Sequence, residues 1–182
     1  MTMEAIKILL DLVDSITNFI QRRKQTKKDL FDNFAEPLYK ELDALIDDYF
    51  LLFKNAHKSI DDTAKNDVSM HLVELKESRE TLWRARRKVE AFAQAVEENV
   101  KDEKFVSFAH QIVRLFQAPD HADAGKKMSK SIVVLGLLES LESGVLDKNS
   151  AQEKLKVIES EVKASWIAVS QSYANLKLHI LS

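Results

Sequence analysis

The stretch of sequence that decides the fold runs from residue 68 to residue 100 and reads "VSMHLVELKESRETLWRARRKVEAFAQAVEENV". Apolar residues recur in it at steps of three and four, which is the spacing of one face of an α-helix. The recurring positions are Val68, Leu72, Leu75, Leu82, Val89, Ala93, Val96 and Val100. We therefore expect one helix of about nine turns here, and a helix of that length predicts an elongated molecule.

The N-terminal segment predicts a second amphipathic helix, over about residues 3–24. Its apolar face consists of Ile6, Leu9, Leu10, Val13, Ile16, Phe19 and Ile20.

Another helix is expected between this segment and the central stretch. Thr26 and Asp29 have the spacing of a capping box, and the apolar pattern that follows them extends to about residue 57. Pro37 lies inside the pattern, so we expect either a kink there or a helix that begins near Glu36. The sequence leaves open whether this helix and the N-terminal one form a single bent rod.

The C-terminal side of the central stretch predicts three more helices. The first covers about residues 105–116, and the second, about 128–143, is apolar almost all round, which places it inside the assembly or against a partner. Gly144 is a suitable C-terminal stop. Ser150 and Glu153 have capping-box spacing and would open the last helix. The apolar face of that helix is Leu155, Ile158, Val162, Trp166, Val169, Tyr173, Leu176 and Ile180.

These patterns predict an all-α fold, an elongated antiparallel bundle of about five or six amphipathic helices, because each apolar stripe must be buried and short turns reverse the chain. The chain has 182 residues, of which 45% are hydrophobic, with only 3 glycines and 2 prolines. One domain over residues 1–182 is therefore expected, in which the helix within residues 1–24 could be semi-independent.

The charge and cysteine counts exclude several classes of function. The chain has 27 basic and 29 acidic residues, a net charge of −2, so it offers no general polycation for nucleic acid. The absence of cysteine removes disulfides and thiolate chemistry and fits a cytoplasmic protein. The longest apolar run, "IVVLGLL" at residues 132–138, is far too short to cross a bilayer, although peripheral attachment to a membrane stays open.

The anomaly of the central stretch is a group of arginines on its apolar seam. Arg79 and Arg86 lie near the centre of the stripe, and further charge and an aromatic ring lie beside them. One interpretation is an anion or partner site, since guanidinium groups clamp phosphates and an indole can stack. The other is that these arginines are internal ion-pair partners of acids on the preceding helix, and we favour it. The binding candidates are Arg79, Trp83, Arg84, Arg86 and Arg87.

A second basic cluster follows the N-terminal helix and consists of Arg22, Arg23, Lys24, Lys27 and Lys28. A cationic cluster beside an amphipathic helix is typical of a segment that lies on an anionic membrane surface. The simpler interpretation, which we favour, is that the cations complement the negative end of a helix packed in the bundle.

No catalytic, cofactor or metal motif is visible. The Glu-x-x-His pairs of di-iron bundles and the glycine loops that hold phosphates are both missing. His121 and Asp123 share a loop-like segment but give only a weak indication of a metal, and no metal or cofactor is expected. The sequence therefore favours a non-enzymatic helical module for protein–protein interaction or assembly, whose expected partner is another protein or a second copy of the chain. The alternatives are a membrane-peripheral protein and, less favoured, an anion- or nucleic-acid-binding protein that uses the arginine group.

Overall fold

The computed structural model describes residues 3–22, 26–61, 73, 87–117 and 130–181. The elements are α1 (Met3–Arg22), α2 (Lys27–Leu30), the π-helix η1 (Phe31–Ala35), α3 (Glu36–Asp61), α5 (Glu103–Phe116), α6 (Lys130–Glu142) and α7 (Lys148–Leu181). Residues 87–99 form a further helix. The all-α fold predicted from the sequence is confirmed for this part of the chain. Most of the expected helix over residues 68–100 lies outside the described residues.

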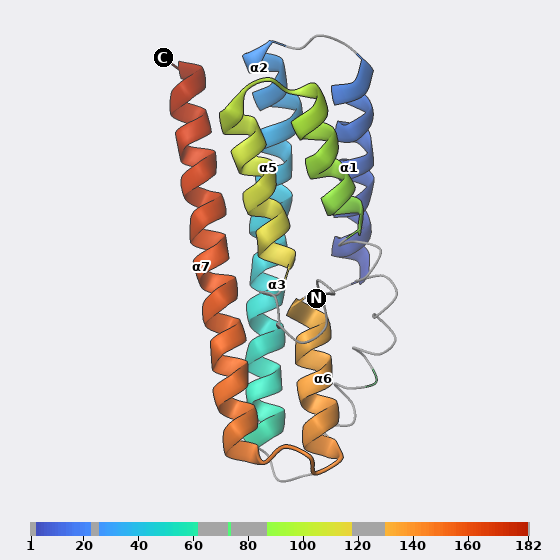
Figure 1. Cartoon of the computed structure of the whole chain (residues 1–182), viewed down its shortest axis with the longest axis vertical. Helices are drawn as coiled ribbons and strands as arrows, with labels where there is room; N and C mark the ends of the chain where they lie inside the picture. The colour runs from blue at the N-terminus through green and yellow to red at the C-terminus, as the bar shows by residue number, and fades with distance from the viewer. Residues whose placement is uncertain (1–2, 23–25, 62–72, 74–86, 118–129, 182) are drawn as a thin grey trace.

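The bundle is elongated, and two long columns span it (Figure 1). One is the uninterrupted rod of α2, η1 and α3, and the other is α7, whose 34 residues extend for about 51 Å. α5 and α6 lie end to end along α7 and run in the same direction, in contrast to the antiparallel order of most neighbours. Both helices fit along one side of α7 because α5 has 14 residues and α6 has 13, which together are fewer than the 34 residues of α7.

The start of the first column follows the predicted capping box. The Asp29 N–H donates to Thr26 Oγ1 over 3.1 Å, and the Thr26 N–H donates to Asp29 Oδ2 over 3.0 Å. The helix then widens into η1, where the Glu36 N–H bonds to the Phe31 carbonyl. Pro37 follows directly and removes one donor from the ladder, so a wider turn before it relieves the crowding. The α-helix resumes at Glu36 and continues to Asp61, so the irregularity expected near Pro37 is the π-helix η1 within a continuous rod.

An aromatic cluster forms the core of the half that contains α1 and α5. Phe34 is fully buried, and its ring centroid lies 5.3 Å from that of Phe92, 5.8 Å from that of Phe105 and 5.9 Å from that of Phe108. α1 adds the face predicted for it, with Leu9, Leu10, Val13, Ile16 and Ile20 buried. The N-terminal helix is therefore part of the bundle core.

The turn from α6 to α7 differs from the sequence prediction at one point. Gly144 ends α6 as expected, with a φ of 74° that L side chains rarely adopt. The predicted capping box of Ser150 and Glu153 is wrong, because α7 begins earlier, at Lys148. Asp147 caps it instead, since Asp147 Oδ1 accepts the Ser150 N–H at 3.0 Å and Asp147 Oδ2 accepts the Ser150 hydroxyl at 2.6 Å.

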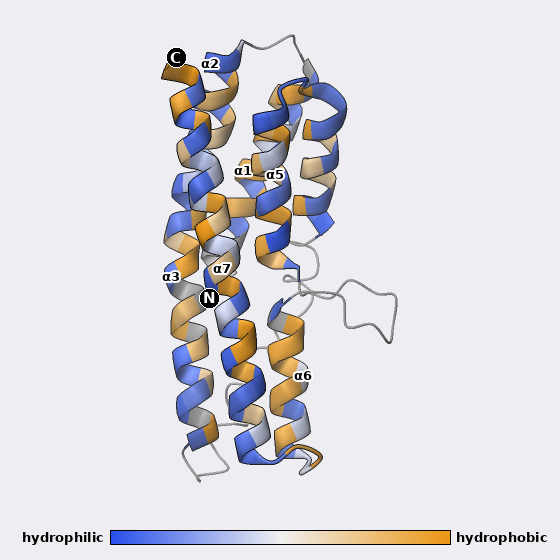
Figure 2. Ribbon diagram, turned by 60° about the vertical axis from the view of Figure 1, so that its left-hand side comes forward, coloured by the Kyte–Doolittle hydropathy of each residue, from blue (hydrophilic) through white to orange (hydrophobic). Residues whose placement is uncertain are grey.

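The two C-terminal helices bury the apolar residues predicted for them. In α7, Leu155, Ile158, Val162, Val169 and Leu176 are buried, and Trp166, Tyr173 and Ile180 are partly buried. In α6, Val134, Leu135, Leu137 and Leu138 are buried. Figure 2 shows the ribbon of α6 as mostly hydrophobic, with hydrophilic segments between the apolar ones.

Candidate interaction surface

The arginine group cannot be placed as a site from the described residues. Arg79, Trp83, Arg84 and Arg86 lie outside them. Arg87 is the first described residue of the helix that covers residues 87–99, and it is exposed. Its neighbour Lys88 forms an ion pair with Asp14 of α1, so this lysine joins two helices of the bundle rather than pairing with the preceding helix.

The basic cluster at residues 22–28 is also only partly described. Arg22 is the last residue of α1, Arg23 and Lys24 lie outside the described residues, and Lys28 is exposed. Lys27 is engaged within the protein, because its Nζ lies 2.9 Å from His179 Nε2 and 3.6 Å from Asp102 Oδ2. With the apolar face of α1 buried, this part of the chain fits the structural interpretation better than the membrane one.

The contacts of Lys27 join the N-terminal end of the first column, at α2, to the C-terminal end of the second column, α7. His179 of α7 lies 2.9 Å, through Nε2, from Asp102 Oδ2, and Asp102 also caps α5 by accepting the Lys104 N–H at 3.0 Å. Burial alone raises the pKa of Asp102, but the bonds with His179 and Lys104 outweigh it, so the pKa lies below its usual value. Lys27, Asp102 and His179 therefore link the start of α2, the start of α5 and the end of α7.

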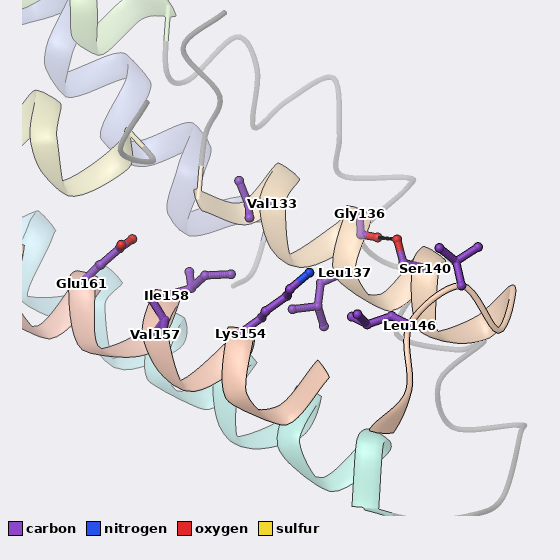
Figure 3. Close-up of a pocket in the computed structure, with 10 residues that line it drawn as sticks. Val133, Gly136, Leu137, Ser140, Leu146, Lys154, Val157, Ile158 and Glu161 are labelled. Carbon is purple, nitrogen blue, oxygen red and sulfur yellow. Dashed lines mark hydrogen bonds between the residues drawn. The ribbon is translucent and has the colours of Figure 1, made fainter. Parts of the chain in front are cut away.

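A pocket of about 390 Å³ opens between α6 and α7 (Figure 3). Its lining is mostly apolar and consists of Val133, Gly136, Leu137, Ser140, Val145, Leu146, Lys154, Val157, Ile158 and Glu161. Lys154 and Glu161 provide the charges and lie seven residues apart, hence on one side of α7. An apolar hollow with a few polar groups is suited to binding an apolar side chain or ligand.

A buried lysine lies close to this pocket. Lys130 is 2% exposed, and its Nζ donates to the carbonyls of Arg114 and Leu115 over 3.1 and 3.2 Å and to Ser165 Oγ over 2.9 Å. Burial lowers the pKa of Lys130 to about 8, although the charge of Glu161 acts in the opposite direction. Its ammonium therefore caps the end of α5 and ties α5, α6 and α7 together.

α7 carries a second stripe on the side away from the core. Every residue of this stripe is exposed, and the residues recur at steps of three and four: Val157, Ser160, Ala164, Ile167, Gln171, Ala174, Leu178 and Leu181. None is charged. The apolar members are strongly exposed, with Val157 at 58%, Ile167 at 56% and Leu178 at 67%. We call these residues the outer stripe.

The outer stripe has the spacing of a coiled-coil seam. If Val157 is position a of a heptad, then Ala164, Gln171 and Leu178 are also a, and Ser160, Ile167, Ala174 and Leu181 are d. The flanking g positions include Lys156, Lys163 and Lys177, and Glu161 is at e. Val157 also lines the pocket, so pocket and stripe form one continuous surface.

The outer stripe was not among the sequence predictions, because one apolar face was assigned to each helix. The signal was present in the sequence. The apolar residues left over after the core face was assigned, such as Val157, Ile167 and Leu178, are separated by sums of three- and four-residue steps, with small or uncharged polar residues at the steps between them.

Within the described residues, no group of three or more histidine, aspartate or glutamate side chains is arranged to hold a metal ion. No helix among these residues is long and apolar enough to span a membrane. Comparisons with protein-family models, curated proteins and solved structures find no match to this chain.

Proposed function

We propose that the protein is a non-enzymatic helical interaction module that binds a helix of another chain along the outer stripe of α7. The observation that carries the proposal is the lack of any charge in a fully exposed stripe with heptad spacing. The solvent side of a bundle helix is normally charged or polar, because it needs only one apolar face for the core. A second apolar stripe is typical of a helix that packs against a further partner.

The pocket supports this proposal because it is an apolar hollow beside Val157, at one end of the outer stripe. Helix-in-groove recognition places large apolar side chains in hollows of the receptor, and such anchors dominate the binding energy. A docked helix that follows the outer stripe passes Val157 and can place one apolar side chain between α6 and α7. Lys154 and Glu161, which also line the pocket, then offer charged partners.

The two other functions expected from the sequence stay predictions. A membrane role for residues 22–28 has less support, since Lys27 is bound to Asp102 and α1 is packed in the core. Four of the five candidates of the arginine group lie outside the described residues, and the anion site and the cytoplasmic location stay predictions.

The proposal is tested with a labelled synthetic amphipathic helix that carries leucine at a and d, used below the concentration at which it self-associates. Fluorescence anisotropy is measured against the parent protein, Ile167→Lys and Ile8→Lys. Ile8 is a matched control because it is 49% exposed on α1, against 56% for Ile167. We expect the labelled helix to bind saturably to the parent and to Ile8→Lys, and not to bind to Ile167→Lys. Equal binding by all three proteins, or none by the parent, would contradict the proposal.

A further inference from the structure

We propose that the helix bound along α7 is α7 of a second copy of this chain, in a parallel and in-register homodimer. This inference rests on the function proposed above and names its partner. In a parallel two-stranded coiled coil, each a or d residue meets the same residue of the other strand. The outer stripe must then be compatible with itself at every layer.

The polar residues of the stripe meet this requirement. Gln171 lies at an a position near its middle, and Ser160 lies at a d position. An amide contains both donors and an acceptor, and a hydroxyl is both donor and acceptor, so each can hydrogen-bond to its own copy across a two-fold axis. A single polar a residue also specifies the register of a coiled coil, because any shift places it against apolar side chains.

The charges beside the stripe favour the parallel orientation. In a parallel pair, a g residue faces the e residue five positions further along the other strand, which places Lys156 opposite Glu161 of the second copy. Symmetry gives this attraction twice. A fully overlapped antiparallel pair instead brings Lys177 of one copy near Lys156 and Lys163 of the other, and these like charges repel.

Side-chain size also fits a self-complementary seam. The stripe from Val157 to Leu181 extends for about 36 Å, and the small residues Ala164 and Ala174 alternate with larger ones. In-register pairing places alanine against alanine, where the helices approach closely, and leucine against leucine at the C-terminal end.

The first test is the mass in solution. Light scattering of the full chain over a range of concentrations is expected to approach twice 20.8 kDa. Ile167→Lys buries a lysine from each copy at the centre of the seam, and should raise the dissociation constant of the dimer by at least about tenfold. Ile8→Lys, on the exposed side of α1, should leave the dissociation constant unchanged. A parent protein that is monomeric at every concentration overturns the inference.

The second test fixes orientation and register. The chain has no cysteine, so Ala164→Cys and Ala174→Cys each introduce a single thiol. In the parallel dimer, each variant places its thiol against the same thiol of the second copy, within the roughly 7 Å Cα separation that a disulfide needs. Both variants should therefore form disulfide dimers in an equilibrating redox buffer, and Ile8→Cys should not.

The alternative orientation gives a distinct result. In the overlapped antiparallel pair, position 164 meets position 174 of the other copy, so only a mixture of the two variants would cross-link. That result overturns the parallel geometry but leaves the proposed function standing. If the protein is monomeric but still binds the amphipathic peptide, the second copy is ruled out as the partner and the proposed interaction module stands. If the protein neither dimerises nor binds the peptide, both proposals are contradicted.

Discussion

Lys130 gives the sharpest prediction about stability, because its ammonium is both buried and fully hydrogen-bonded. The side chain is 2% exposed, and Nζ donates to two carbonyls at the end of α5 and to Ser165. Burial lowers its pKa from 10.5 to about 8. The unfolded chain therefore holds this proton more tightly than the folded protein does.

The size of the effect follows from the two pKa values. Their separation, at about 1.4 kcal/mol per pH unit, corresponds to about 3 kcal/mol. Between pH 8 and 10.5 the unfolded chain binds one proton more than the folded protein. The free energy of unfolding that Lys130 contributes therefore rises with pH through this window, by about 3 kcal/mol in total.

The assay compares the parent with Lys130→Met, which keeps the length of the side chain but has no charge. Urea unfolding is followed by circular dichroism from about pH 7 to about pH 10.5, and the free energy of the variant is subtracted from that of the parent. Other titrating groups are common to both proteins and largely cancel. We expect the difference to rise by about 3 kcal/mol over this range. A difference that stays flat would refute the lowering of the pKa of Lys130 on folding.

Three further predictions concern the glycines in and after α6 and the caps of α7 and α5. Gly144→Ala should destabilise the protein by about 1 kcal/mol because of the positive φ, whereas Gly136→Ala, with open space around the added carbon, should stabilise it by up to about 1 kcal/mol in thermal unfolding. In urea unfolding, Asp147→Ala should lower the free energy of unfolding by about 1 kcal/mol, and Glu153→Ala should hardly change it. Equal losses in the two variants would instead support the capping box of Ser150 and Glu153. Asp102→Asn should lose stability at pH 7. Because folding lowers the pKa of Asp102, the extra free energy of unfolding of the parent over Asp102→Asn should disappear as the pH falls below about 4. A difference between the two proteins that does not change with pH would contradict this.

Much of the architecture could be predicted because it depends on local patterns. The capping box of Thr26 and Asp29, the stop at Gly144 and the core face of α7 are each set by residues within a turn or two of one another. The starting residue of α7 was missed because aspartate and serine are both good caps, and the choice between them depends on where the preceding turn ends.

The features that were missed depend on contacts distant in sequence. Lys130 is buried because α5 ends beside the start of α6, and nothing in its neighbourhood in the sequence indicates this. The end-to-end order of α5 and α6 likewise follows from the length of α7 rather than from either short helix. The outer stripe was visible in the sequence, but only the structure shows that Ile167 and Leu178 face away from the core.

The central claim, that the outer stripe is an interaction surface, is tested most directly by the reactivity of a thiol placed on it. Ile167→Cys and the matched Ile8→Cys are labelled with a thiol reagent at low and high protein concentration, and with the amphipathic peptide. The account predicts that labelling at position 167 slows when the protein is concentrated or the peptide is added, while labelling at position 8 keeps its rate. Equal and unchanged rates at the two positions under all these conditions would contradict it.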